Sequence, residues 1–97
     1  MNDLPDITRE AQSNHGRYVV RLASGEEAEM TWVVREPCIR DFNHTYVPEV
    51  FRGSGIAAKL MDRAIEDARA EGFRIVPTCS FVAAQFRRHP DWADLTA

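Results

Sequence analysis

The segment around which the chain is arranged is residues 44–71, HTYVPEVFRGSGIAAKLMDRAIEDARAE. It starts with a β-branched and aromatic run at residues 45–47, which stops at Pro48. A turn with two glycines follows, and apolar residues then recur at helical spacing from Ile56 onward. A strand that leads through glycines into a helix is typical of an anion-binding site, because the first N–H groups of a helix have no intrahelical partner. Glycine also adopts positive φ and leaves room for the anion.

The turn at residues 52–57, RGSGIA, differs from two common phosphate-binding motifs. It is not a Walker loop because no Gly-Lys-Ser/Thr follows, and it is not G-x-G-x-x-G because residue 58 is alanine. It fits the pattern Arg-x-x-Gly-x-Ala. An ordinary strand-to-helix turn with a glycine at the helix start is the alternative interpretation.

Composition limits the classes of protein to consider. The 97 residues suffice for one small domain, and 44% hydrophobic with 28% charged residues is ordinary for a globular protein. The formal net charge of −3 gives no general attraction to nucleic acid or an anionic membrane, so we expect neither partner. No apolar run approaches about 18 residues, and the N-terminus lacks a secretory pattern. We therefore expect a cytoplasmic protein in which Cys38 and Cys79 form no disulfide.

Before the central segment, alternating patterns predict an antiparallel meander. Residues 1–16 are polar, and we expect a partly mobile lead-in with room for a short edge strand near Ile7. Strands are predicted at residues 17–22 and 28–34. Residues 38–47 form either a third strand or two short ones with a kink between them.

After the turn, we expect a helix over residues 54–71 that ends at Gly72 in the left-handed conformation. A strand over 73–79 should then lie parallel to the strand ending at residue 47. A second helix over 81–88 and a tail that docks Trp92 and Leu95 complete an α+β (α/β) domain. Core positions are predicted at Trp32, Cys38, Phe42 and Trp92. The solvated face of the long helix is predicted to carry Lys59, Asp62, Arg63, Glu66, Asp67 and Arg69.

Motifs along the chain then support a resemblance. His44-Thr45-x-Val47-Pro48, Arg52-Gly53-x-Gly55-Ile56-Ala57, Val76-Pro77-x-Cys79-x-Phe81 and His89-Pro90 occur in that order. Together they resemble the GNAT superfamily of acyl-CoA N-acyltransferases, in its small YjdJ-like branch, over roughly residues 17–95. The resemblance implies a minimal GNAT fold, in which a β-meander precedes a β-α-β parallel pair and a C-terminal helix. It also implies acetyl-CoA as co-substrate. Ser54 and Ala57 depart from the commonest loop, but neither blocks backbone donation.

The cofactor would follow the central segment. The pantetheine arm can add to the strand edge at residues 45–47 as if it were a strand. The diphosphate would meet the loop N–H groups, with Arg52 and either Lys59 or Arg87 at other phosphate oxygens. The acetyl group would lie between Val47 and Cys79. The cofactor-binding residues are predicted to be Tyr46, Val47, Arg52, Gly53, Ser54, Gly55, Ile56, Ala57 and Phe81.

Two residues are candidates for the chemistry. His44 is the candidate base, because histidine titrates near physiological pH; the alternative is a structural strand-end anchor. Cys79 precedes a helix, where thiolate is favoured, and is either a nucleophile, a lining residue or a redox-active thiol. Tyr46 is either a hydroxyl donor or a packing residue. His44, Cys79 and His89 lack the spacing of zinc ligands, so no metal is expected.

The function that follows is acetyl-CoA-dependent N-acetylation of a primary amine, on a small molecule or a protein lysine, by direct attack in a ternary complex. We expect a monomer or weak homodimer. Two alternatives stay open, a non-catalytic CoA-binding module or partner subunit and a structural interaction domain.

Overall fold

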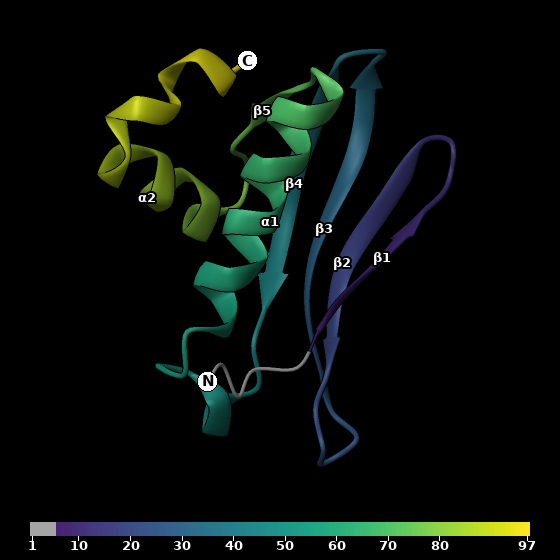
Figure 1. The fold of residues 1–97 in the computed structure, drawn as a ribbon, viewed down its shortest axis with the longest axis vertical. Helices are drawn as coiled ribbons and strands as arrows, with labels where there is room; N and C mark the ends of the chain where they lie inside the picture. Colours follow the sequence, from purple (N-terminus) through teal and green to yellow (C-terminus); the bar gives the residue numbers. More distant parts are fainter. Residues whose placement is uncertain (1–5) are drawn as a thin grey trace.

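The computed structural model describes residues 6–97 and arranges them as a sheet with helices on one side (Figure 1). The elements are β1 (Ile7–Ala11), β2 (His15–Arg21), β3 (Glu27–Glu36), β4 (Ile39–Tyr46), the 3-10 turn η1 (Glu49–Phe51), α1 (Ile56–Glu71), β5 (Arg74–Val76), α2 (Ser80–Arg88) and the 3-10 segment η2 (Pro90–Leu95). The sheet order β1-β2-β3-β4-β5 follows the chain, with antiparallel neighbours except for the parallel pair β4–β5. The predicted α+β class, with a meander followed by a β-α-β pair, is confirmed.

The lead-in contains the expected edge strand and is otherwise more regular than expected. The edge strand near Ile7 is present as β1, and all of Ile7–Ala11 pairs with Gly16–Val20 of β2. The meander therefore has four strands rather than three, and β2 begins at His15 rather than residue 17. An exposed edge strand can be as polar as a loop, so the composition of residues 1–16 did not distinguish the two. Residues 1–5 of the predicted lead-in lie outside the described part of the chain.

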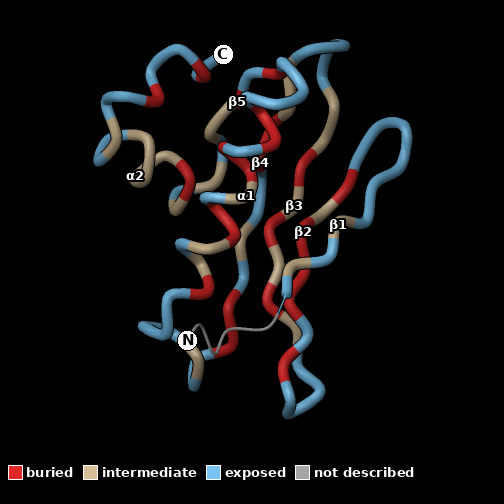
Figure 2. The backbone as a smooth tube through the Cα atoms, viewed as in Figure 1, coloured by how far each residue is buried: buried red, intermediate tan, exposed pale blue. Residues whose placement is uncertain are grey.

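The core fills the space between the sheet and the helices. Tyr18, Trp32 and Phe42 project from β2, β3 and β4, and each is at most 2% exposed. Their rings contact one another, with 4.8 Å between the centroids of Tyr18 and Trp32. Leu60 of α1 and Val82 of α2 are fully buried in the same cluster. Figure 2 shows the buried positions in red along the strands and α1. The opposite side of the sheet, which no helix covers, is called the open face below.

Two predicted element boundaries move for identifiable reasons. The long helix begins at Ile56 rather than Ser54, because Gly55 stands at its N-cap with φ 93°. The strand predicted over residues 73–79 is only Arg74–Val76, because Pro77 has no N–H to continue the ladder. The predicted stop at Gly72 is confirmed, with φ 77° and its N–H donating to the carbonyl of Ala68.

Two predicted environments are wrong. Cys38 is exposed rather than part of the core, because it lies in the turn that joins β3 to β4. Asp67 is buried rather than solvated, because it faces Tyr18 and accepts a hydrogen bond of 2.7 Å from its hydroxyl. The predicted docking of Trp92 and Leu95 is confirmed, since both are buried in η2.

Within residues 6–97, no helix combines the length and apolarity that crossing a membrane requires. The same residues contain no group of three or more His, Cys, Asp or Glu side chains placed to hold a metal ion.

Candidate functional site

The course of β4 decides which side chains meet at the site. Trp32 of β3 pairs with Phe42, but the preceding Thr31 pairs with His44, so Asn43 is an extra residue in β4. This irregularity is a β-bulge, which bends a strand and redirects its side chains. Phe42 faces the helices before the bulge, whereas His44 after it shares the open face with Thr31. The kink considered for residues 38–47 is this bulge within one strand.

Beyond the bulge, β4 and the chain after β5 separate. The parallel ladder pairs Ile39–Asp41 with Arg74–Val76, and one further bond of 2.9 Å runs from the N–H of Cys79 to the carbonyl of Phe42. Over the described residues, no backbone hydrogen bond joins residues 43–46 to the chain after Cys79. We call this gap the seam. It leaves one edge of β4 available to an extended ligand.

The loop between η1 and α1 presents backbone donors. Gly53 and Gly55 have φ of 86° and 93°, which only glycine adopts without strain. The first helical bond runs from the N–H of Lys59 to the carbonyl of Gly55. The N–H groups of Gly53, Gly55, Ile56 and Ala57 therefore find no backbone acceptor within residues 6–97. Four such donors at a helix start suit a phosphate.

Unlike the N–H groups of the two glycines that flank it, the N–H of Ser54 already has an acceptor within the turn. Its N–H and its hydroxyl both donate to the carbonyl of Phe51, at 3.2 and 2.5 Å. These two bonds hold the turn in shape. We therefore expect Ser54 to stabilise the conformation of the loop rather than to donate to a ligand itself.

Two adjoining cavities connect this loop with the seam. The first, of about 350 Å³, is lined by Val47, Phe51, Arg52, Gly53, Gly55, Ile56, Ala57 and Ala58. The second, of about 270 Å³, is lined by Thr45, Tyr46, Val47, Arg52, Ala57 and Phe81. Nearly all residues predicted to bind the cofactor thus line one continuous surface, which runs from the start of α1 to the start of α2.

Three basic residues were predicted to reach phosphate oxygens. Arg52 lines both cavities, and its Nε donates to the carbonyl of Val47 at 3.2 Å, which ties the loop to the end of β4. Lys59 lines a separate groove between α1 and Ile7. Arg87 is exposed in the last turn of α2.

His44 lies on the open face with its side chain 53% exposed. Its Nε2 is 3.4 Å from Oε2 of Glu29, on the neighbouring strand. The other Glu29 oxygen accepts a bond of 2.8 Å from Nη1 of Arg17. Glu29 was not predicted to take part. The alternation of residues 28–34 predicted that Glu29 lies on the polar face of that strand. Only the register between β3 and β4 places it beside His44.

Cys79 lies on the helix side, half-buried at the N-cap of α2. Its Sγ is 3.4 Å from Oγ1 of Thr45, which faces the helices because it pairs with the buried Met30. Cys79 and Cys38 are both free thiols. His44 and Cys79 therefore flank the seam from opposite sides of the sheet.

Tyr46 of β4 and Phe81 of α2 both line the smaller cavity. Tyr46 is 45% exposed, so it is not the packing residue that strand tyrosines commonly are. Phe81 is in the first turn of α2 and packs against the core cluster. The two aromatic residues give the seam apolar walls.

Comparisons with known proteins identify the family and the fold. A family model described as GCN5-related N-acetyl-transferase matches residues 17–95. Among solved structures, the chain is similar to the NMR solution structure of a GCN5-like protein from Staphylococcus aureus, with a TM-score of 0.73 and 22% sequence identity. The match covers 100% of this chain and 91% of that one. At this identity, the similarity concerns the fold.

Proposed function

Since the chain belongs to the GCN5-related N-acetyltransferase family, we propose that it transfers an acetyl group from acetyl-CoA to a primary amine. The observation that carries this proposal is the row of N–H groups at Gly53, Gly55, Ile56 and Ala57, which have no backbone acceptor among residues 6–97 and lie at one end of the open seam. An anionic, extended ligand such as CoA requires both features together.

In this proposal, the cofactor follows the two adjoining cavities. The diphosphate accepts hydrogen bonds from the loop N–H groups, where the dipole of α1 adds favourable charge. Arg52 supplies a guanidinium beside it. The amides of the pantetheine arm bond to the free edge of β4 as a further strand would. The thioester then lies in the seam near Thr45 and Cys79.

The chemistry needs few protein groups, because a thioester is already activated and positioning supplies much of the rate. His44 takes a proton from the ammonium group, and the amine nitrogen attacks the thioester carbon. The C–S bond breaks, the pair of electrons leaves with the CoA sulfur, and the second proton that the nitrogen loses passes to that sulfur, so the products are the amide and the CoA thiol. A backbone N–H near Tyr46 or Val47 stabilises the charge that develops on the carbonyl oxygen. Glu29, whose Oε2 is 3.4 Å from Nε2 of His44, orients the imidazole.

The position of Cys79 permits a second route, in which its thiolate first accepts the acetyl group. We favour direct attack, because Cys79 shares its hydrogen bond with Thr45 and no described basic side chain within bonding distance activates it. In the direct route, Cys79 lines the seam and positions the thioester.

We further propose that the enzyme works in the cytoplasm as a monomer or weak homodimer, without nucleic acid, membrane or metal. The two free cysteines suit a reducing compartment, and the net charge of −3 does not favour polyanionic partners.

Steady-state kinetics with acetyl-CoA and a panel of primary amines tests the proposal. We expect intersecting double-reciprocal lines, as a ternary complex requires. Tight binding of acetyl-CoA with no transfer to any amine would instead indicate a non-catalytic CoA-binding module. Absence of both binding and transfer at millimolar acetyl-CoA would reject the proposal.

A further inference from the structure

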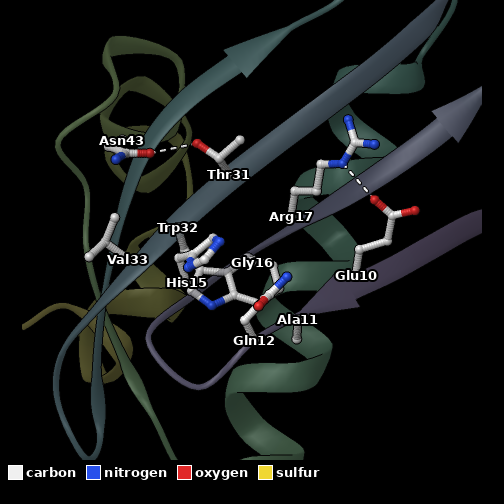
Figure 3. A pocket seen from close by; sticks show the side chains of 10 residues that line it. All are labelled: Glu10, Ala11, Gln12, His15, Gly16, Arg17, Thr31, Trp32, Val33 and Asn43. Carbon is white, nitrogen blue, oxygen red and sulfur yellow. Dashed lines mark hydrogen bonds and ion pairs between the residues drawn. The ribbon is translucent and has the colours of Figure 1, made fainter.

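The open face carries a hollow that the proposed cofactor site does not use (Figure 3). Its volume is about 530 Å³, within the range of small-molecule sites. It extends across β1, β2, β3 and β4, and Figure 3 shows it on the side of the sheet away from both helices. The residues that matter here are Gln12, His15, Arg17, Thr31, Val33 and Asn43.

The polar groups of the hollow are mainly uncharged. Gln12, Thr31 and Asn43 offer amide and hydroxyl groups, and Oγ1 of Thr31 lies 2.6 Å from Oδ1 of Asn43. The charged pair in the lining is internally neutralised, because Nε of Arg17 donates to Oε1 of Glu10 at 2.8 Å. Such a lining favours a ligand with a hydroxyl-rich or amide-rich body. Glu10 is the one carboxylate among the described lining residues, which gives a polycation little to bind, and Ala11, Trp32 and Val33 supply an apolar floor for the carbon skeleton of such a ligand.

The hollow meets the reaction site at Asn43. This residue lines the hollow, and it is also the first residue of β4 past the last backbone bond to the chain after β5. Thr31 lines the hollow too, and it pairs with His44 in the sheet. A ligand that fills the hollow therefore has one end beside His44 and at the mouth of the seam.

We propose that this hollow binds the acceptor, and that the acceptor is a small primary amine with an uncharged, hydrogen-bonding body of the kind found in amino sugars. This inference rests on the proposed acetyl transfer. The amine end enters the seam from the open face, while the thioester reaches it from the helix side. The amine end then lies beside His44, the proposed base, whose Nε2 is 3.4 Å from Oε2 of Glu29.

The test uses a cavity-filling variant and a matched control on the same face. Val33→Trp fills the hollow from half-buried Val33 without touching either cavity of the cofactor site. Thr8→Trp places the same ring on exposed Thr8 of β1, outside the lining of the hollow. Glucosamine, spermidine and a lysine-containing peptide are the acceptor probes, and the dissociation constant of acetyl-CoA is measured for each variant.

We expect glucosamine to have the lowest KM of the three probes in the wild type. Val33→Trp should raise that KM by about tenfold or more, equivalent to about 1.4 kcal/mol. The affinity for acetyl-CoA should stay unchanged, and Thr8→Trp should alter neither value. An unchanged glucosamine KM in Val33→Trp overturns the inference, and so does a preference for the peptide or spermidine.

Amide NMR spectra of the wild-type protein with CoA provide a readout that does not need turnover. Addition of glucosamine should shift the signals of Gln12, Thr31 and Asn43. Shifts confined to other residues, or none with any probe, contradict the inference even when CoA binds. Failure of CoA to bind would instead reject the proposed function itself.

Discussion

His44 and Cys79, the two candidate chemical groups, are separated by the strand that connects them. The bulge at Asn43 turns His44 to the open face, whereas Cys79 lies with Thr45 on the helix side. A thioester that enters the seam from the helix side would thus lie on the same side of the sheet as the Cys79 thiol. The His44 imidazole would lie on the opposite side. For this arrangement we propose proton transfer by His44 and a positioning role for Cys79.

Replacement of His44 by alanine removes the proposed base and leaves the cofactor surface intact. We expect kcat to fall by about 10²–10⁴-fold, which is the usual contribution of a positioned acid or base. The dissociation constant of acetyl-CoA should not change, because His44 lines neither cofactor cavity. Full activity of His44→Ala would exclude the histidine as base.

Replacement of Cys79 by alanine separates the two routes. In the direct route, transfer continues within a few-fold of wild type, because the amine attacks the thioester itself. Mass spectrometry of the wild-type protein after brief exposure to acetyl-CoA, without acceptor, should find no acetyl group on Cys79. A trapped acetyl-Cys79 together with an inactive Cys79→Ala variant would establish the covalent route instead.

At the scale of elements, the loop before α1 depends on two left-handed glycines. A side chain at Gly53 would have open space around it, so strain in a variant comes from its φ of 86° alone. Gly25, in the turn between β2 and β3, has a similar φ of 90° and equally open surroundings. The two positions differ in one respect, since Gly53 lines the proposed cofactor cavity and Gly25 does not.

Gly53→Ala and Gly25→Ala therefore form a matched pair. Each should lower the free energy of unfolding by about 1–2 kcal/mol, the cost of placing an L-residue in the left-handed region. Isothermal titration should show weaker acetyl-CoA binding for Gly53→Ala alone. If both variants bind acetyl-CoA as the wild type does, the loop does not hold the diphosphate.

A second inter-element link joins β2 to α1. The hydroxyl of buried Tyr18 donates to Asp67 at 2.7 Å, and Asp67 also accepts from Arg9 and Arg63. Burial raises the pKa of Tyr18 well above its usual range, and the hydrogen bond to Asp67 adds to the shift. In the folded protein, Tyr18 therefore stays protonated at a pH at which the unfolded chain has lost that proton.

The sign of the pH effect follows from the raised pKa. The contribution of Tyr18 is complete below about pH 10, the value for an unfolded tyrosine, and is lost as the pH rises above it. Denaturant titrations between pH 8 and pH 11 should show the free energy of unfolding falling by at most about 1.4 kcal/mol per unit from this group. Tyr18→Phe should be less stable at pH 8, because Asp67 loses a partner, and should show a shallower fall above pH 10. An identical slope in Tyr18→Phe would refute this explanation.

At the scale of the whole molecule, local signals predicted most elements. The left-handed stop at Gly72, the helical spacing after Ile56 and the motif at residues 52–57 all depend on neighbours in the chain. The match over residues 17–95 confirms family membership, and the similar solved structure confirms the fold class. Assignment to the YjdJ-like branch stays a prediction.

Features that depend on strand register could not be predicted from local signals. The pairing of Glu29 with Tyr46 brings Glu29 near His44, and it follows from the bulge at Asn43, which has no sequence signature. Asp67 falls on a helical face that otherwise carries charges, and only the buried hydroxyl of Tyr18 explains its burial. The hollow on the open face likewise arises from four strands together.

We propose different tasks for the two faces of the sheet at β4. In this proposal the helix side holds the cofactor between α1 and α2, the open face holds the amine, and the seam connects them. The most direct test of where the cofactor binds is an amide NMR titration of isotope-labelled protein with CoA. We predict that the largest shifts fall at residues 45–47 and 53–57, the edge of β4 and the loop before α1. Large shifts confined to other surfaces, such as the groove that Lys59 lines, would contradict the account, as would an unchanged spectrum at millimolar CoA.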